Sequence, residues 1–221
     1  MLAGFGWQLW KGLCVTLEVS LCAFLFGMCL AVVLTVLEFS PSKITRKLVF
    51  IFTSLVRGLP ELLVLFGVYF GGSALLMAVL HKPAEIDAFA AGVLALGVLF
   101  AAYASQTFRG AFLVIPKGQI EAAKVLGFSG WKIFWKISCP QAWRYALPGV
   151  GNLWLVLLKD SALVSLIGLA DLMNQAQLAA STTREPFKFY LVAALLFLIL
   201  TTISQYFLKY SYERSTRYLA K

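Results

Sequence analysis

Charged side chains are scarce in this sequence of 221 residues: Asp, Glu, Lys and Arg make up 13% of it, with ten acids, nineteen bases and one histidine. A soluble globular domain carries about 25% charged residues. So few charges cannot cover the surface that a folded chain of this length exposes to water. The scarcity excludes a water-soluble enzyme domain, and the apolar content excludes a disordered chain.

Cysteine and histidine are equally sparse. The four cysteines form no Cys-x-x-Cys pair, and three of them, Cys14, Cys22 and Cys29, lie in one apolar run. The single histidine, His81, has no second metal ligand near it in the sequence. We therefore expect neither a disulfide framework nor a metal site, and we interpret the cysteines as small packing residues.

What the sequence does contain is apolar length: 61% of its residues are hydrophobic and its mean hydropathy is +0.85. A transmembrane helix needs about 20 mainly apolar residues. Five stretches reach that length, and none alternates as the strands of a membrane barrel do. The sequence predicts an all-α, polytopic membrane protein, a single domain over 1–221 with spans at about 12–37, 50–80, 88–108, 147–170 and 186–208.

The bases indicate how these spans are oriented. With five spans, the loop after the first, the loop after the third and the C-terminal tail share one side. Thirteen of the nineteen bases fall there: Lys43, Arg46, Lys47, Arg109, Lys117, Lys124, Lys132, Lys136, Arg144, Lys209, Arg214, Arg217 and Lys221. Because cytoplasmic loops are rich in Lys and Arg, we expect the N-terminus outside and the C-terminus in the cytoplasm. The net charge of +9 then reports topology and not a nucleic-acid partner.

The segment 109–146, between the third and fourth spans, is too polar to cross a membrane and too regular for a simple linker. Its pattern predicts a short helix over 119–126, which Gly127 can end in the left-handed conformation. Ser129 can cap a second, amphipathic helix, in which Trp131, Phe134, Trp135 and Ser138 recur at spacings of three and four. On these residues alone, a docking surface and a helix pair lying in the membrane interface are both open.

Motifs in this loop and beside the spans carry a resemblance to a known family. Glu121, Ala122, Ala123 and Gly127, followed by Ile137 and Pro140, resemble the EAA motif of bacterial ABC importers. RGLPE at 57–61, AAYASQTFRGAF at 101–112 and ALPGVGNLWLVLLKDSALVSLIG at 146–168 are similar to segments of ABC transporter permease subunits of the polar amino acid uptake family, of the arginine and histidine/lysine/arginine/ornithine type. The resemblance covers essentially the whole chain, and Cys139 departs from it where the motif usually has Leu.

The resemblance implies that 109–146 forms the coupling helices, in which Glu121, Ala122, Ala123 and Gly127 dock onto an ATP-hydrolysing partner. The sequence fits this, because it contains no G-x-x-x-x-G-K-[ST] phosphate loop and so lacks a hydrolytic site of its own. Docking is therefore favoured over the membrane-interface alternative. We expect the chain to be no enzyme and to hold no cofactor, with ATP and Mg²⁺ bound by a separate ATPase subunit.

Four charged residues, Arg57, Glu61, Lys159 and Asp160, lie at depth inside the spans, and Glu18 is a fifth, nearer the outer end of the first span. A charge at mid-membrane costs at least about 2.5–3.5 kcal/mol, so each of the four needs a partner or a pathway. Arg57 and Glu61 are four residues apart and can pair along one helix face. Pro60, between them, removes a backbone donor and favours a broken helix of the kind at which transporters bind substrate. Lys159 and Asp160 are adjacent and point about 100° apart on a helix, so they do not pair within it.

Asn152 and Ser161 add polar atoms to the same span as Lys159 and Asp160. Ion pairs that only fix the packing of the helices are the alternative to a substrate site here.

The resemblance also indicates the cargo. In the resembling family the RGxP segment and the K-[DST]-[ST]-[AS]-L-V-S stretch line the translocation cavity, and many relatives for uncharged amino acids lack acids in both. Here Glu61 and Asp160 are acids, which favours a basic amino acid, arginine first and histidine, lysine or ornithine as alternatives. We expect Asp160 to contact the cationic side chain of the cargo. Glu61 is the second candidate and ranks below Asp160, because Arg57 competes with the cargo for it. Arg57 itself can hold the cargo carboxylate.

The resemblance implies partners too. Two permease subunits enclose one pathway in this family, so we expect a homodimer or heterodimer with an ABC ATPase dimer and a periplasmic or lipoprotein substrate-binding protein, in a bacterial cytoplasmic (inner) membrane. The small residues Gly67 and Gly71 can seat a neighbouring helix, within the subunit or at its interface. The alternative function is a secondary amino acid transporter driven by an ion gradient. Such a transporter usually has an internal repeat, and we find no convincing repeat among the five spans.

Overall fold

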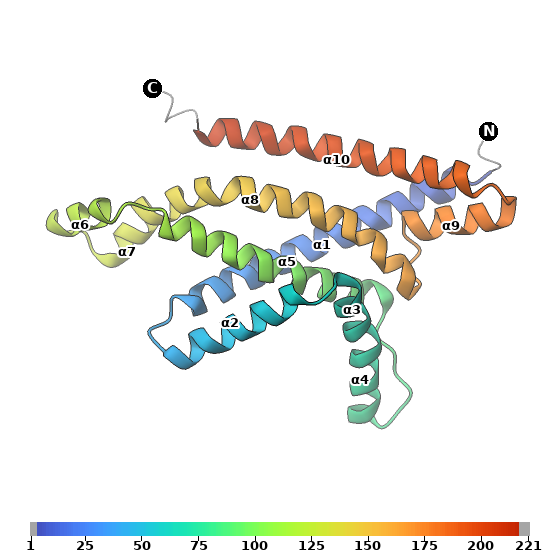
Figure 1. Ribbon diagram of the computed structural model, residues 1–221, viewed down its shortest axis with the longest axis horizontal. Helices are drawn as coiled ribbons and strands as arrows, with labels where there is room; N and C mark the ends of the chain where they lie inside the picture. The colour runs from blue at the N-terminus through green and yellow to red at the C-terminus, as the bar shows by residue number, and fades with distance from the viewer. Residues whose placement is uncertain (1–3, 217–221) are drawn as a thin grey trace.

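The computed structural model describes residues 4–216, and within them the chain is built from helices joined by short turns (Figure 1). Five helical stretches are long and apolar enough to cross a membrane: Gly6–Glu38, Glu61–Leu80, Ala88–Leu113, Gly130–Ile167 and Pro186–Arg214. The prediction of an all-helical membrane protein with five spans is confirmed. Arg217 and Lys221, two of the bases counted in the tail, lie outside the described residues.

The second span begins at Glu61, and the prediction that it begins near residue 50 is wrong. α2 (Lys43–Gly58) is a separate amphipathic helix, and the span consists of α3 (Glu61–Phe66), a π-helical stretch η1 (Gly67–Gly71) and α4 (Gly72–Leu80). Leu59 and Pro60 are extended between them, because proline lacks a backbone N–H and disfavours a helical conformation in the residue before it. α3 and α4 therefore leave α2 at a steep angle (Figure 1).

The fourth span begins earlier than residue 147, where the sequence predicted it. α7 (Gly130–Ile133), a π-helical stretch η2 (Phe134–Ser138), α8 (Cys139–Asp160) and a 3₁₀ stretch η3 (Ser161–Ile167) follow one another without a turn. Pro140 lies in the first turn of α8, directly after the π-helical stretch, where a widened turn accommodates its ring. The second helix of the loop is therefore the start of the fourth span, and α5 (Ala88–Leu113) likewise runs beyond residue 108.

The core forms where α1 (Gly6–Glu38) packs along α5, with α8 packed against both helices. A Cβ on Gly27 of α1 would lie 2.7 Å from the carbonyl oxygen of Gly97 on α5. Small residues at such a crossing let two backbones approach closely, which is how helices associate when lipid surrounds them. The rings of Phe24, Phe100 and Trp154 then join the three helices through edge-to-face contacts at 5.1 and 5.3 Å.

A second apolar cluster holds α9 (Leu172–Thr183) and the first half of α10 (Pro186–Thr216) against the start of α1. The buried Asp171 caps α9 by accepting a hydrogen bond from the Asn174 N–H at 2.9 Å. The Leu172 N–H donates to the Thr16 hydroxyl of α1 at 3.1 Å. These bonds fix the segment between the fourth and fifth spans onto α1.

The three base-rich segments gather at one end of the molecule. The connection between α1 and α2, the helices α6 (Lys117–Val125) and α7, and the C-terminal end of α10 lie at the left of Figure 1, while α9 and the start of α1 lie at the right. The left end is called the basic end below. The arrangement agrees with the predicted grouping of the loops on one side.

Candidate functional site

The broken helix at Pro60 carries the first of the predicted site residues. Arg57 lies in the last turn of α2 and Glu61 opens α3, so the break separates them and they form no ion pair within residues 4–216. The expectation that they pair along one helix face is wrong, because that geometry needs a continuous helix. Instead, the guanidinium of the exposed Arg57 lies 5.4 Å from the ring centre of Tyr103 on α5, and the Tyr103 hydroxyl donates to the Arg57 carbonyl at 3.4 Å.

Two acids from distant parts of the sequence lie near one another. Glu61 is at the start of α3, Asp160 is the last residue of α8, and α3 contacts the 3₁₀ stretch that follows Asp160. Both side chains are half-buried. Within the described residues neither acid forms an ion pair. The structure thus places two carboxylates together beside a helix break.

The remaining predicted residues of this site differ in accessibility. Lys159 and Asn152 are exposed on α8. Ser161 is fully buried, and its hydroxyl donates to the Leu158 carbonyl of its own helix at 2.8 Å. Ser161 therefore contributes to the packing at the end of α8, whereas the two acids, Arg57, Lys159 and Asn152 present polar groups on the surface. Tyr103 was not among the predicted residues, although a tyrosine among the alanines of 101–104 is a signal for it.

The EAA segment forms a compact projection at the basic end. Glu121 and Ala122 are exposed on α6, and the buried Ala123 accepts a hydrogen bond from the Phe128 N–H at 3.0 Å. Gly127 follows the helix in the left-handed region, at φ +76°. Ser129 then caps α7 by accepting from the Lys132 N–H. The predicted helix end at Gly127 and the cap at Ser129 are both confirmed.

Exposed apolar side chains surround this projection. Val125 is 88% exposed, Leu126 75% and Trp131 72%. The rings of Trp131 and Trp135 pack edge to face at 5.5 Å, and the Gln141 amide donates to Gln119 at 2.7 Å, which ties α6 to α8. The result is a rigid apolar surface around Glu121, of the kind that binds a partner protein.

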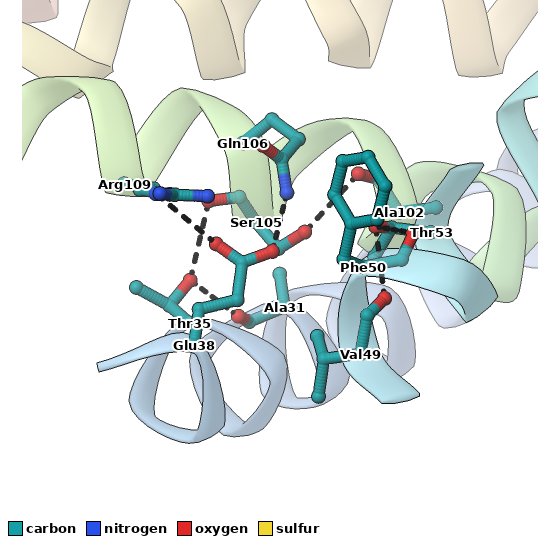
Figure 2. Close-up of polar contacts among 10 residues, drawn as sticks. All are labelled: Ala31, Thr35, Glu38, Val49, Phe50, Thr53, Ala102, Ser105, Gln106 and Arg109. Carbon is teal, nitrogen blue, oxygen red and sulfur yellow. Dashed lines mark hydrogen bonds and ion pairs between the residues drawn. The ribbon is translucent and has the colours of Figure 1, made fainter. Parts of the chain in front are cut away.

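A polar cluster that the sequence analysis missed lies between α1, α2 and α5 near the basic end (Figure 2). The buried carboxylate of Glu38 accepts a hydrogen bond from the Gln106 amide and forms an ion pair with Arg109, with 3.8 Å between Nε and Oε2. Thr35 bonds the carbonyl groups of Ala31 and Ser105, at 2.7 and 3.4 Å. The polar residues of 105–109 were a signal, but their partners on α1 are about 70 residues away in sequence.

Known proteins match this chain over most of its length. Residues 23–218 match the family described as "Binding-protein-dependent transport system inner membrane component". The arginine ABC transporter permease protein ArtQ of Haemophilus influenzae is 47% identical over 204 residues, which cover 92% of this chain and 91% of the relative. The histidine/lysine/arginine/ornithine transport system permease protein HisQ of Salmonella typhimurium is 39% identical and covers 92% and 91%.

A solved structure agrees with these sequence matches. The crystal structure of an amino acid ABC transporter with histidines contains a chain that superposes with a TM-score of 0.84 and 30% identity, over 94% of each chain. The similarity therefore extends along nearly the whole chain.

Proposed function

Because the chain belongs to the family of binding-protein-dependent transport system inner membrane components, we propose that it forms half of the translocation pathway of an ATP-driven importer for a basic amino acid. Arginine is the first cargo to test, and histidine, lysine and ornithine are the alternatives. Relatives of this chain are named as permeases for arginine and for histidine, lysine, arginine and ornithine. The chain is a transport subunit, and a partner hydrolyses ATP.

The observation that carries the proposal is the pair of acids at the helix break. Glu61 and Asp160 come from different spans that contact one another at this point, are half-buried and form no ion pair within the described residues. A guanidinium or ammonium group brings the opposite charge that such a pair lacks. We assign Asp160 and Glu61 to the cationic side chain of the cargo.

Arg57 suits the other end of an amino acid. Since Glu61 does not bind it, its guanidinium stays exposed above the Tyr103 ring. A ring below a guanidinium holds the planar group in place and leaves its N–H donors at the edges. We assign Arg57 to the cargo carboxylate, with the exposed Lys159 and Asn152 as further polar contacts and Ser161 as a packing residue.

The EAA segment supports the assignment of an ATPase partner. Exposed Glu121 and Ala122, with Ala123 and Gly127, form a projection rimmed by exposed apolar side chains. We propose that this projection docks into a dimer of ATPase subunits, which bind ATP and Mg²⁺. The basic end then faces the cytoplasm of a bacterial cell, with the N-terminus outside the inner membrane and the opposite end near a substrate-binding protein.

A second permease subunit, identical or homologous, completes the pathway. A Cβ on Gly67 or on Gly71 would meet no atom of this chain within 4 Å. These glycines therefore seat no helix within the described part of this subunit, and we assign them to the surface that lipid or the second subunit covers. The span that contains them and α10 are both largely exposed, as expected of surfaces covered by lipid or by a second subunit.

Transport by the assembled complex tests the cargo assignment. The chain is reconstituted into liposomes with its ATPase subunits and a loaded binding protein, and arginine uptake and arginine-stimulated ATP hydrolysis are measured. Asp160→Asn and Glu61→Gln each remove one charge from the acid pair, and we expect each to weaken the arginine response about tenfold or more, since hydrogen bonds to charged groups contribute about 1.5–3 kcal/mol.

Glu18→Gln is the matched control, because Glu18 is an exposed acid of α1, a helix that carries none of the assigned cargo contacts. An arginine response that is unaltered in both acid variants refutes the cargo site. A proton ionophore separates the importer from its rival: uptake that needs ATP and survives the ionophore supports the importer, and uptake that the ionophore abolishes supports an ion-driven transporter.

A further inference from the structure

α2 has the surface of a helix that lies against lipid. Of its residues only Val49 and Thr53 are buried, whereas Ile44, Leu48, Phe50 and Leu55 are all more than 60% exposed. Three of its four bases, Lys43, Arg46 and Lys47, lie in the first turn and a half, and the fourth, Arg57, lies in the last turn. Apolar residues beside a cluster of bases are typical of a helix at the boundary between headgroups and acyl chains.

A cavity of about 280 Å³ opens beside these bases, lined by Glu38, Arg46, Lys47, Phe50 and Arg109. Its walls come from the end of α1, the start of α2 and the end of α5, which meet near the basic end (Figure 2). Three bases face one acid there, an excess of two positive charges.

The single acid in the cavity has its partners on α5, although its Oε2 accepts no hydrogen bond within the described residues. The side chain of Glu38 is 4% exposed, and it is held by the Gln106 amide and by Arg109 Nε. The Arg109 side chain is itself 45% exposed and lines the cavity. Arg46 and Lys47 form no ion pair within residues 4–216. The cavity therefore presents positive charge that nothing in the described chain neutralises.

We propose that this cavity binds the headgroup phosphate of an anionic phospholipid, whose acyl chains lie along the exposed apolar face of α2. Positive charge and apolar surface occur side by side here, because Phe50 lines the cavity and continues into that apolar face. A free phosphate pairs only with the bases, whereas an anionic lipid pairs with the bases and also covers the apolar face of α2. Basic pockets between membrane helices select anionic headgroups by the same charge complementarity.

A lipid in this position contacts two helices that lead to different parts of the chain. Arg46 and Lys47 belong to α2, which leads to the helix break at Pro60, and Arg109 belongs to α5, which leads into α6. The phosphate would bridge the two helices. The site is separate from the proposed cargo and ATPase contacts, so neither of those assignments is needed for it.

Native mass spectrometry of the full chain, purified with its copurifying subunits in a neutral detergent, tests the proposal. The probes are palmitoyl-oleoyl phosphatidylglycerol, the matching phosphatidylcholine and soluble glycerol phosphate. The test variant is Arg46→Gln with Lys47→Gln, which leaves Arg109 in place so that Glu38 keeps its partner. The control variant is Lys43→Gln with Lys117→Gln, which removes the same charge from exposed positions outside the cavity.

We expect the affinity of the tightest phosphatidylglycerol site to fall about 25-fold in the test variant, about fivefold for each base removed. In the control variant it should fall less than twofold. Equal weakening in the two variants, or none in the test variant, overturns the proposal. Phosphatidylcholine bound as tightly as phosphatidylglycerol overturns it as well, because the apolar face alone would then account for binding. Glycerol phosphate that displaces the lipid at equal concentration would instead identify a site for a free anion.

Discussion

Replacing Gly127 by valine alters one backbone preference and leaves the contacts of this chain nearly untouched. Gly127 has φ +76°, and a Cβ built on it would meet no heavy atom within 4 Å. The left-handed conformation costs an L-residue about 1–2 kcal/mol, and a β-branched residue adopts it least readily. No steric clash adds to that cost, so the substitution should not prevent folding or membrane insertion.

The cost falls on the turn that shapes the EAA projection. In that turn the Phe128 N–H donates to the Ala123 carbonyl at 3.0 Å and the Gly127 N–H to the Lys124 carbonyl at 3.0 Å. A penalty of 1–2 kcal/mol lowers the population of this turn about 5- to 30-fold relative to its competitors. We expect Gly127→Val to lower the amount of arginine carried per ATP hydrolysed about tenfold in the reconstituted complex.

Two variants make this experiment specific. Gly130→Val is the control, since Gly130 is equally open to a Cβ but has no left-handed backbone. Gly127→Asn is the rescue, because asparagine enters the left-handed region more easily than other residues with a Cβ, and it should retain most of the coupling. Coupling that is unchanged in Gly127→Val, with the protein inserted in normal amounts, refutes the role assigned to this turn.

Two further expectations concern stability. Burial raises the pKa of the Asp171 carboxyl to about 6, although the N–H groups of Asn174 and Met173 act to lower it. The protonated carboxyl therefore stabilises the fold below about pH 4, and this stabilisation is lost as the pH rises through about 6. The loss amounts to about 3 kcal/mol in the free energy of unfolding. Melting curves of Asp171→Asn and the native chain from pH 4 to 7.5 should diverge in that window, and parallel curves would contradict the burial. Gly27→Val places a Cβ 2.7 Å from the Gly97 carbonyl, so α1 and α5 must separate at a cost of about 1–3 kcal/mol. Its melting temperature should fall, while Gly110→Val, which meets no atom, should melt like the native chain.

Local signals explain most of what was predicted correctly from the sequence. Proline at residue 60 and glycine at residue 127 each constrain the backbone at their own position, so the helix break and the helix end can be read without knowing any neighbour. The five apolar stretches are equally local, because a membrane sets their length directly. The predicted start of the fourth span was wrong because a proline does not always end a helix. Pro140 was interpreted as part of a loop, yet the π-helical stretch before it lets one helix continue from Gly130.

The missed features depend on contacts between distant segments. Glu38 meets Gln106 and Arg109 only because α1 and α5 pack along their lengths, and the Gly27–Gly97 crossing that fixes their register is one small-residue pair among many. Arg57 was paired with Glu61 from their spacing, whereas the break at Pro60 turned it toward Tyr103, 46 residues away. Spacing predicts a pair only within an element that remains continuous.

The acid pair also bears on the alternative that charges in the spans merely fix helix packing. A packing pair has opposite charges in contact, since each neutralises the other in a poorly polar surrounding. Glu61 and Asp160 carry the same charge and form no ion pair within the described residues. Like charges held together in this way make the empty site unfavourable and a cationic occupant favourable. The arrangement is costly as a support for packing, and it supports the proposed site for a basic amino acid.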